Sequence, residues 1–113
     1  MKKWNVTVTP EFGDDIRGIH SYISYTLLEP TIAKNVVDQI LKAVGELSEL
    51  PLHFPVYEKE PWQSRGLRKI SVGNFMVFYL TNEETSAVIV LHVFYAGRNI
   101  EKCLDDLISA NQS

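Results

Sequence analysis

Three basic side chains stand close together in a stretch of the sequence that contains no acidic residue. Arg65, Arg68 and Lys69 are the only charged residues between positions 65 and 82, and Arg98 follows a long apolar segment. If these segments share a sheet, the bases collect at one end of it, where they can hold a phosphate or receive an acidic partner segment. A solvated sheet edge with local ion pairs accounts for the same spacing, and both interpretations stay open.

The histidines offer a second kind of chemistry. His92 lies in an apolar segment, where an imidazole can act as a general base, although a histidine in such a place is more often packed with one hydrogen bond. The three histidines, His20, His53 and His92, lack the spacing of metal ligands, and the sequence has no P-loop, GxGxxG or GxSxG motif. Cys103, the single cysteine, is expected to be a buried apolar residue. We therefore expect no metal site and no cofactor.

The composition indicates a single domain over residues 1–113. Of the 113 residues, 45% are hydrophobic and 22% are charged, values close to the globular average. A net charge of −3 argues against a protein that coats nucleic acid. No apolar run is long enough to span a bilayer, and the N-terminus lacks the apolar region of a secretory signal. We expect a soluble, cytoplasmic protein.

The first half of the sequence predicts one strand and two helices. Residues 3–9 alternate apolar and polar side chains, which is typical of a half-buried strand. Thr9-Pro10-Glu11 then has the pattern of a helix start, and apolar spacings of three and four indicate one helix from there to Leu27 and a second with its stripe from Ala33 to Leu47. The short break at Glu29-Pro30-Thr31 predicts an antiparallel helical hairpin. Gly18 and Gly45 lie inside these helices, and we attribute them to close helix packing.

The second half predicts a loop followed by a three-stranded meander. Three prolines and several aromatic residues over 51–64 indicate a loop that lies against the domain. Strands are expected at residues 67–72, 75–81 and 87–96, the first two joined by the hairpin signal Gly73-Asn74. A short last helix is expected from Asn99, with apolar positions at Ile100, Leu104, Leu107 and Ile108. The predicted fold class is α+β, with an antiparallel sheet of the N-terminal strand and the meander packed against the helical hairpin.

Three segments of this second half resemble the signature of the RelE/ParE superfamily of bacterial toxins. They are Arg65-Gly66-Leu67-Arg68-Lys69-Ile70, Val72-Gly73-Asn74-Phe75-Met76-Val77-Phe78-Tyr79 and Val93-Phe94-Tyr95-Ala96-Gly97-Arg98-Asn99-Ile100. Upstream, Leu28-Glu29-Pro30-Thr31-Ile32-Ala33 and Leu47-Ser48-Glu49-Leu50-Pro51 fall where that superfamily has its helix junction and the end of its second helix. The resemblance covers nearly the whole chain.

This resemblance implies the toxin of a type II toxin–antitoxin module, neutralised by a cognate antitoxin and present as a homodimer or a toxin–antitoxin hetero-oligomer. RelE-like members cut mRNA in the ribosomal A site, whereas ParE-like members poison DNA gyrase without cutting nucleic acid. RelE-like nucleases resemble one another in having a basic residue just after the aromatic that follows the hairpin turn, where this chain has Met76 after Phe75. They often carry a Tyr or His near the C-terminus, and this chain has neither after Tyr95. The chain is therefore closer to ParE-like members, with gyrase as the candidate target.

Two other interpretations stay open. As a RelE-like, metal-independent endoribonuclease acting on the ribosome and mRNA, the chain would use Lys69, Arg68, Arg98 and His92 as catalytic residues. As a non-toxic family member, it would only bind its antitoxin. For protein binding, period two places Lys69 and Ser71 on one face with Met76 and Phe78, and with His92 and Phe94. An apolar face with a basic margin suits protein docking, and the predicted partner-binding residues are Arg65, Arg68, Lys69, Met76, Phe78 and Arg98.

Overall fold

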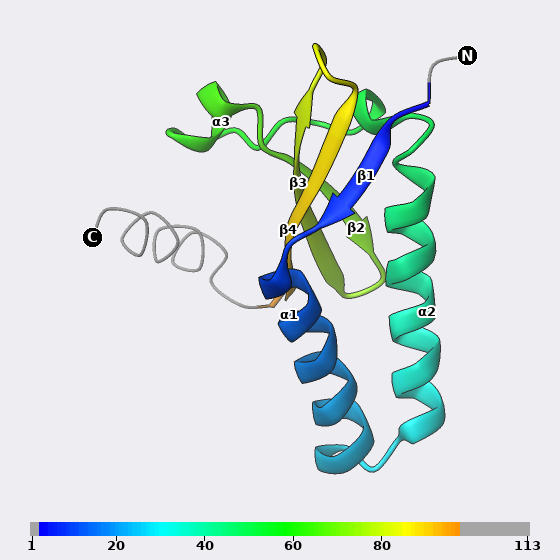
Figure 1. Ribbon diagram of the computed structural model, residues 1–113. Coiled ribbons are helices and arrows are strands. Elements are labelled where there is room, and N and C mark those ends of the chain that lie inside the picture. The colour runs from blue at the N-terminus through cyan, green and yellow to red at the C-terminus, as the bar shows by residue number, and fades with distance from the viewer. Residues whose placement is uncertain (1–2, 98–113) are drawn as a thin grey trace.

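One four-stranded sheet with a helical hairpin on one face forms the body of the molecule (Figure 1). The computed structural model describes residues 3–97. The strands are β1 (Asn5–Val8), β2 (Arg68–Val72), β3 (Phe75–Asn82) and β4 (Ala87–Tyr95), in the spatial order β1-β4-β3-β2. The helices are α1 (Pro10–Ser21), its π-helical continuation η1 (Tyr22–Thr26), α2 (Pro30–Glu46), the 3₁₀ turn η2 (Pro51–His53) and α3 (Trp62–Arg65). The predicted α+β fold class is thus confirmed.

The prediction of a wholly antiparallel sheet is wrong at one strand pair. β2 pairs with β3, and β3 with β4, in antiparallel fashion, but β1 runs parallel to β4, with Asn5 opposite Ala87 and Val8 opposite Val90. The connection from β1 to the meander passes through both helices, and a connection of that length lets the chain return in the same direction. Residue alternation carries no information about strand direction. The predicted last helix and Cys103 lie outside the described residues.

The helical hairpin begins as the sequence predicts. The hydroxyl of Thr9 accepts a hydrogen bond from the backbone N–H of Phe12 at 3.1 Å, and Pro10 occupies the first helical position. The apolar stripe of α1 points Phe12, Ile16 and Ile19 toward the sheet. The apolar stripe of α2 contributes further side chains to the same layer. Together with one face of β2, β3 and β4 they form the main core, whose buried residues are Phe12, Ile40, Val44, Leu47, Ile70, Val77, Tyr79, Val88, Val90 and Val93.

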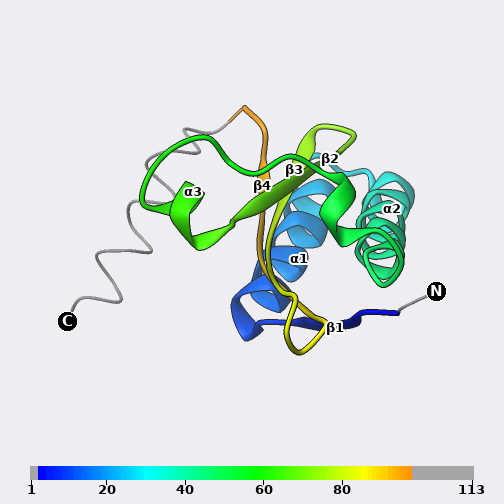
Figure 2. The same ribbon diagram turned by 90° about the horizontal axis from the view of Figure 1, so that it is seen from above.

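A smaller core covers the opposite face of the sheet. The predicted loop folds back over this face, carrying α3 with it (Figure 2). Trp62 of α3 and Leu67 pack on Phe78 and Phe94, and Tyr57 makes an edge-on ring contact with Phe78. α3 ends at Gly66, whose φ of +76° is a left-handed conformation that favours glycine. The expectation that this loop lies against the domain is confirmed.

The two helix glycines do not serve helix packing, which corrects the prediction for both. Gly18 in α1 and Gly45 in α2 are exposed, and a Cβ atom added at either position would meet no neighbouring atom within 4 Å. A glycine inside a helix costs about 1 kcal/mol relative to alanine. The described part of the chain gives no intramolecular reason for either residue.

No helix in the described part of the chain is long and apolar enough to cross a membrane.

Candidate protein-interaction site

The strand register brings the predicted face together. Lys69 lies opposite Phe78 and Phe78 opposite His92, while Ser71, Met76 and Phe94 form the next row across the three strands. Residues directly opposite each other point to the same side of the sheet. The shared face expected from the period of two is therefore confirmed.

Most of this face is nevertheless inaccessible to a partner. Phe78 has no exposed surface, because Trp62, Leu67 and Phe94 enclose it. The ring of Phe78, one of the predicted partner-binding residues, therefore belongs to the second core. Met76 is half-buried at the margin of this cluster. The period of two located these residues on the sheet correctly but carried no information about the loop that covers them.

Arg68 is engaged within its own chain. Its guanidinium donates hydrogen bonds to the backbone carbonyls of Phe54 and Leu52, and the backbone bridge between Val56 and Arg68 holds the same segment. The loop that precedes α3 is thereby fastened to the start of β2. Both hydrogen bonds come from one nitrogen, Nη1, so this arm of the guanidinium is not available to a phosphate.

The other two described bases differ in exposure. Lys69 is half-buried, with its ammonium 5.6 Å from the centre of the Tyr57 ring. Arg65 is exposed, and its guanidinium carbon lies 5.5 Å from the centre of the Trp62 ring. Both arrangements are cation–π contacts. Arg65 and Lys69 are thus the described members of the predicted basic margin that a partner can reach, while Arg98 lies outside the described residues.

His92 is held between two elements. Its Nδ1 atom lies 2.8 Å from Oδ2 of Asp15, a residue of α1, and its ring stacks on Phe94 with centroids 5.1 Å apart. The side chain is 13% exposed. Among the predicted catalytic residues that the structure describes, Arg68 and His92 therefore have defined structural contacts, and they lie on β2 and β4, which β3 separates in the sheet.

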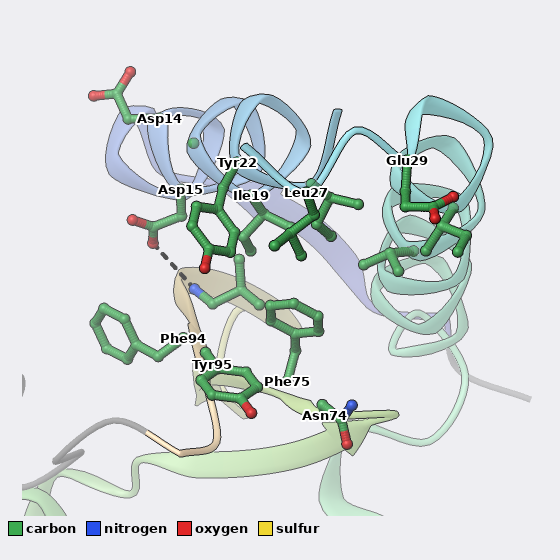
Figure 3. A pocket seen from close by; sticks show the side chains of 15 residues that line it. Asp14, Asp15, Ile19, Tyr22, Leu27, Glu29, Asn74, Phe75, Phe94 and Tyr95 are labelled. Carbon is green, nitrogen blue, oxygen red and sulfur yellow. Dashed lines mark hydrogen bonds between the residues drawn. The ribbon is translucent and has the colours of Figure 1, made fainter. Parts of the chain in front are cut away.

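A groove that the sequence did not predict opens beside His92. It lies between α1 with η1, the start of α2, the start of β3 and the end of β4, and it encloses about 760 Å³ (Figure 3). Asp15 points toward β4 and accepts the N–H of Val93 at 3.1 Å, whereas Tyr22, Leu27 and Ile19 project into the groove. Its lining residues are Asp14, Asp15, Gly18, Ile19, Tyr22, Ile23, Leu27, Glu29, Ile32, Val36, Asn74, Phe75, Val93, Phe94 and Tyr95.

The groove is apolar with an acidic rim. Tyr22, Leu27, Ile32 and Tyr95 are each about half exposed, at 56%, 51%, 49% and 52%. The charged residues among those that line it are all acids, Asp14, Asp15 and Glu29. Exposed apolar surface gathered in one concave place marks interaction sites on soluble proteins. Gly18, which the sequence led us to attribute to close helix packing, lines this groove.

The comparisons with known proteins agree with this architecture. Residues 6–100 match the ParE toxin family of type II toxin–antitoxin systems, parDE. The chain belongs to the ParE toxin family. The expected place in the RelE/ParE superfamily is therefore confirmed, and the match covers the sheet and the helical hairpin except for Asn5 at the start of β1. A comparison with curated protein sequences gave no significant match.

Three solved structures share the ParE-type fold. A chain of the chromosomal ParDE toxin–antitoxin system from P. aeruginosa superposes with a TM-score of 0.68 at 16% identity, over 84% of this chain and 98% of that one. A chain of the RelE–RelB complex from Pyrococcus horikoshii OT3 gives 0.61 at 17% identity, over 87% and 99%. A chain of the toxin–antitoxin complex RelBE2 from Mycobacterium tuberculosis gives 0.58 at 22% identity, over 82% and 98%. At these identities the likeness is one of fold.

Proposed function

We propose that this ParE-family protein is the toxin of a toxin–antitoxin module, and that it arrests bacterial growth by binding a protein, with DNA gyrase as the candidate target. A cognate antitoxin neutralises it in the cytoplasm. The observation that carries this proposal is the engagement of the candidate nuclease residues: Arg68 is bound to loop carbonyls and His92 to Asp15. A protein-binding toxin needs no catalytic constellation.

The chemistry of RNA cleavage supports the same choice. Attack by a 2′-hydroxyl needs a base for that proton, positive charge at the phosphate and an acid for the leaving oxygen. Met76 stands where a nuclease of this superfamily would have a basic residue, and a thioether cannot stabilise a developing negative charge. The loss of one such contact typically costs about 2.7–4 kcal/mol of transition-state stabilisation. Lysine, the type of Lys69, is a poor base near neutral pH unless its pKa is strongly lowered.

The antitoxin partner is supported by the family and by the three structural relatives, all of which come from toxin–antitoxin systems. Arg65 and Lys69 offer exposed or half-buried positive charge to carboxylates of that partner. Reversing both charges, in Arg65→Glu with Lys69→Glu, is expected to weaken the toxin–antitoxin complex at least several-fold by calorimetry. An unchanged affinity would remove the basic margin from the interface.

The test of the function is induction of this protein alone in a bacterial host. Growth should stop, primer extension on a reporter mRNA should show no new cuts in the ribosomal A site, and purified protein should inhibit supercoiling by gyrase. Discrete A-site cuts that vanish in Lys69→Ala would establish the nuclease instead. Normal growth after induction would establish a non-toxic member that only binds its antitoxin.

A further inference from the structure

A second hollow lies between the two helices of the hairpin, and it shares no lining residue with the groove of Figure 3. Its lining residues are Ile16, Arg17, His20 and Ser21 of the first helix and Val37 of α2. The hollow encloses about 370 Å³, whereas an apolar space of about 150 Å³ already holds a group of the size of benzene. It therefore has room for an apolar side chain from outside.

An exposed leucine lies beside this hollow. Leu41 follows Val37 by one turn on the same side of α2, and it is 47% exposed. One turn further along is Gly45, where an added Cβ atom would meet nothing of the described chain within 4 Å. A glycine on a helix surface lets another helix approach closely. An apolar projection, an apolar hollow and a place for close approach thus lie next to one another.

A surface with both a projection and a hollow fits a second copy of itself. A two-fold axis makes every contact reciprocal, so Leu41 of each copy can enter the hollow beside Val37 of the other. This requires the two α2 helices to run antiparallel, with the centre of the contact midway between Val37 and Leu41. In a parallel pair the two Leu41 side chains would meet each other, and both hollows would stay open.

The charges of α2 select the same arrangement. Lys34, Asp38, Lys42 and Glu46 are exposed, alternate in sign and follow one another at intervals of four residues, so they form one charge row along the helix. Within the chain, Lys34 lies 3.6 Å from Asp38 in an exposed pair.

An antiparallel second copy opposes unlike charges in this row. With the centre of the contact at Ile40, Lys34 faces Glu46 of the other copy, and Asp38 faces Lys42. A parallel copy in register would instead oppose like charges. The centre that Leu41 requires lies one residue away, which is only about 1.5 Å along a helix. The apolar contact and the charge row therefore agree on one arrangement.

We propose that this protein forms a two-fold symmetric homodimer through its helical hairpin. The α2 helices run antiparallel, Leu41 of each copy fills the hollow of the other, and the two charge rows pair. The residues of this surface include none that line the groove and neither Arg65 nor Lys69. The dimer therefore leaves both places open and does not depend on the proposed toxicity. Because its ion pairs are exposed, it should weaken as salt increases.

The apolar part of the contact is tested by sedimentation velocity of the full-length protein at micromolar to submillimolar concentrations in low salt. The wild-type protein should shift from monomer to dimer as its concentration rises. Leu41→Asp should weaken the dimer by about tenfold or more, because its carboxylate would enter an apolar hollow. Leu50→Asp is the matched control: Leu50 is 60% exposed but lies beyond the end of α2, so the dimer should be unchanged.

The glycines supply a matched steric test of the same contact. Gly45→Leu should weaken the dimer by about tenfold or more, because its side chain fills the space that the other helix needs. Gly18→Leu, the same change on the other helix at a position equally free of neighbours, should have no effect. Circular dichroism shows whether each variant is folded.

Charge exchange tests the antiparallel arrangement. Lys34→Glu with Lys42→Glu makes the row wholly acidic, and Asp38→Lys with Glu46→Lys makes it wholly basic. Each double variant alone should dimerise at least about tenfold more weakly, since four exposed pairs become repulsive. An equal mixture of the two should recover the dimer, which a misfolded variant could not do.

Three outcomes would overturn the proposal. The first is a wild-type protein that stays monomeric at submillimolar concentration. The second is a Leu41→Asp variant that dimerises as well as the wild type. The third is a mixture of the acidic and basic variants that associates no better than either alone. Normal growth after induction would contradict the proposed toxicity, but it would leave these measurements on the purified protein decisive for the dimer.

Discussion

The carboxylate of Asp15 joins α1 to β4 at His92. Oδ2 of Asp15 lies 2.8 Å from Nδ1 of His92 and accepts the N–H of Val93 at 3.1 Å. Just before it in the chain, the hydroxyl of Thr9 donates to the carbonyl of Leu91 at 2.7 Å. β1 pairs with β4 only as far as Val90. Beyond Val90, therefore, the edge of β4 forms its hydrogen bonds with Thr9 and Asp15 in place of β1.

Replacing Asp15 should loosen this junction. In Asp15→Ala the N–H of Val93 loses its acceptor and the ring of His92 loses its partner, so we expect the free energy of unfolding to fall by about 1–3 kcal/mol. Urea denaturation followed by circular dichroism measures the change. Asp14→Ala is the matched control, because its exposed ion pair should contribute no more than about 0.5 kcal/mol. Equal effects of the two substitutions would contradict the assigned role of Asp15.

We expect Arg68 to stabilise the loop before α3 rather than to bind a phosphate. Arg68→Ala removes the donor that the carbonyls of Leu52 and Phe54 share, and we expect a loss of about 1–3 kcal/mol in unfolding free energy. Limited proteolysis should cut the segment around Val56 faster in this variant. Arg65→Ala, which loses only an exposed cation–π contact, should cost no more than about 1 kcal/mol. If the variant resisted proteases as well as the wild type, Arg68 would not hold this loop in place.

Tyr79 predicts how stability depends on pH in the alkaline range. Burial raises the pKa of Tyr79 from 10.0 to about 12, against a smaller opposing effect of the Arg68 charge, and its hydroxyl donates to the carbonyl of Pro51 at 2.6 Å. The unfolded chain therefore loses this proton first as pH rises. The contribution of Tyr79 to the free energy of unfolding is therefore complete below pH 10. It decreases between pH 10 and 12, by about 2–3 kcal/mol in all.

The matched variant for this prediction is Tyr79→Phe. It should cost about 0.5–1.5 kcal/mol at pH 7, since the carbonyl of Pro51 loses its donor. The difference in unfolding free energy between wild type and variant, measured by urea at pH 8 to pH 11, should shrink and change sign as the tyrosine ionises in the unfolded chain. A constant difference over that range would show that Tyr79 does not titrate as described.

The two helix glycines should be replaceable without harm to the isolated protein. Neither Gly18 nor Gly45 has a neighbour within 4 Å of an added Cβ atom, and alanine restricts the unfolded chain. We expect Gly18→Ala and Gly45→Ala each to raise the free energy of unfolding by about 0.4–1 kcal/mol, seen as higher urea midpoints. A loss of stability in either variant would reveal a contact within the chain that the glycine serves.

Local patterns in the sequence predicted the elements well, because each has a local physical cause. Thr9-Pro10 fixes the start of α1 by capping, and Gly73-Asn74 fixes the β2–β3 turn, where Gly73 has a φ of +59°. The direction of β1 was not predictable in this way, because it depends on a partner strand at the other end of the sequence. The same is true of Phe78, whose burial depends on where the loop with Trp62 folds.

The groove was hidden from the sequence for a related reason. Leu27 ends the first predicted helix and Ile32 lies in the predicted junction, while Tyr22 was given no role. The exposure of all three side chains depends on where the sheet ends beside the helical hairpin. Periodicity indicates which residues share a helix face. It does not indicate where an apolar face extends past the layer that covers it.

The pairing of β1 with β4 determines when during synthesis the fold can be completed. Thr9 and Leu91 lie 82 positions apart, and β1 lies at an edge of the sheet with β4 as its neighbour. The helical hairpin depends on local contacts and can form early, whereas contacts between distant positions form slowly and only when both strands are present. Synthesis proceeds from the N-terminus at about 5–20 residues per second, so β1 waits several seconds for β4. Ribosome-bound fragments that stop before β4 therefore lack the fourth strand, the contacts of Asp15 with His92 and Val93, and one wall of the groove.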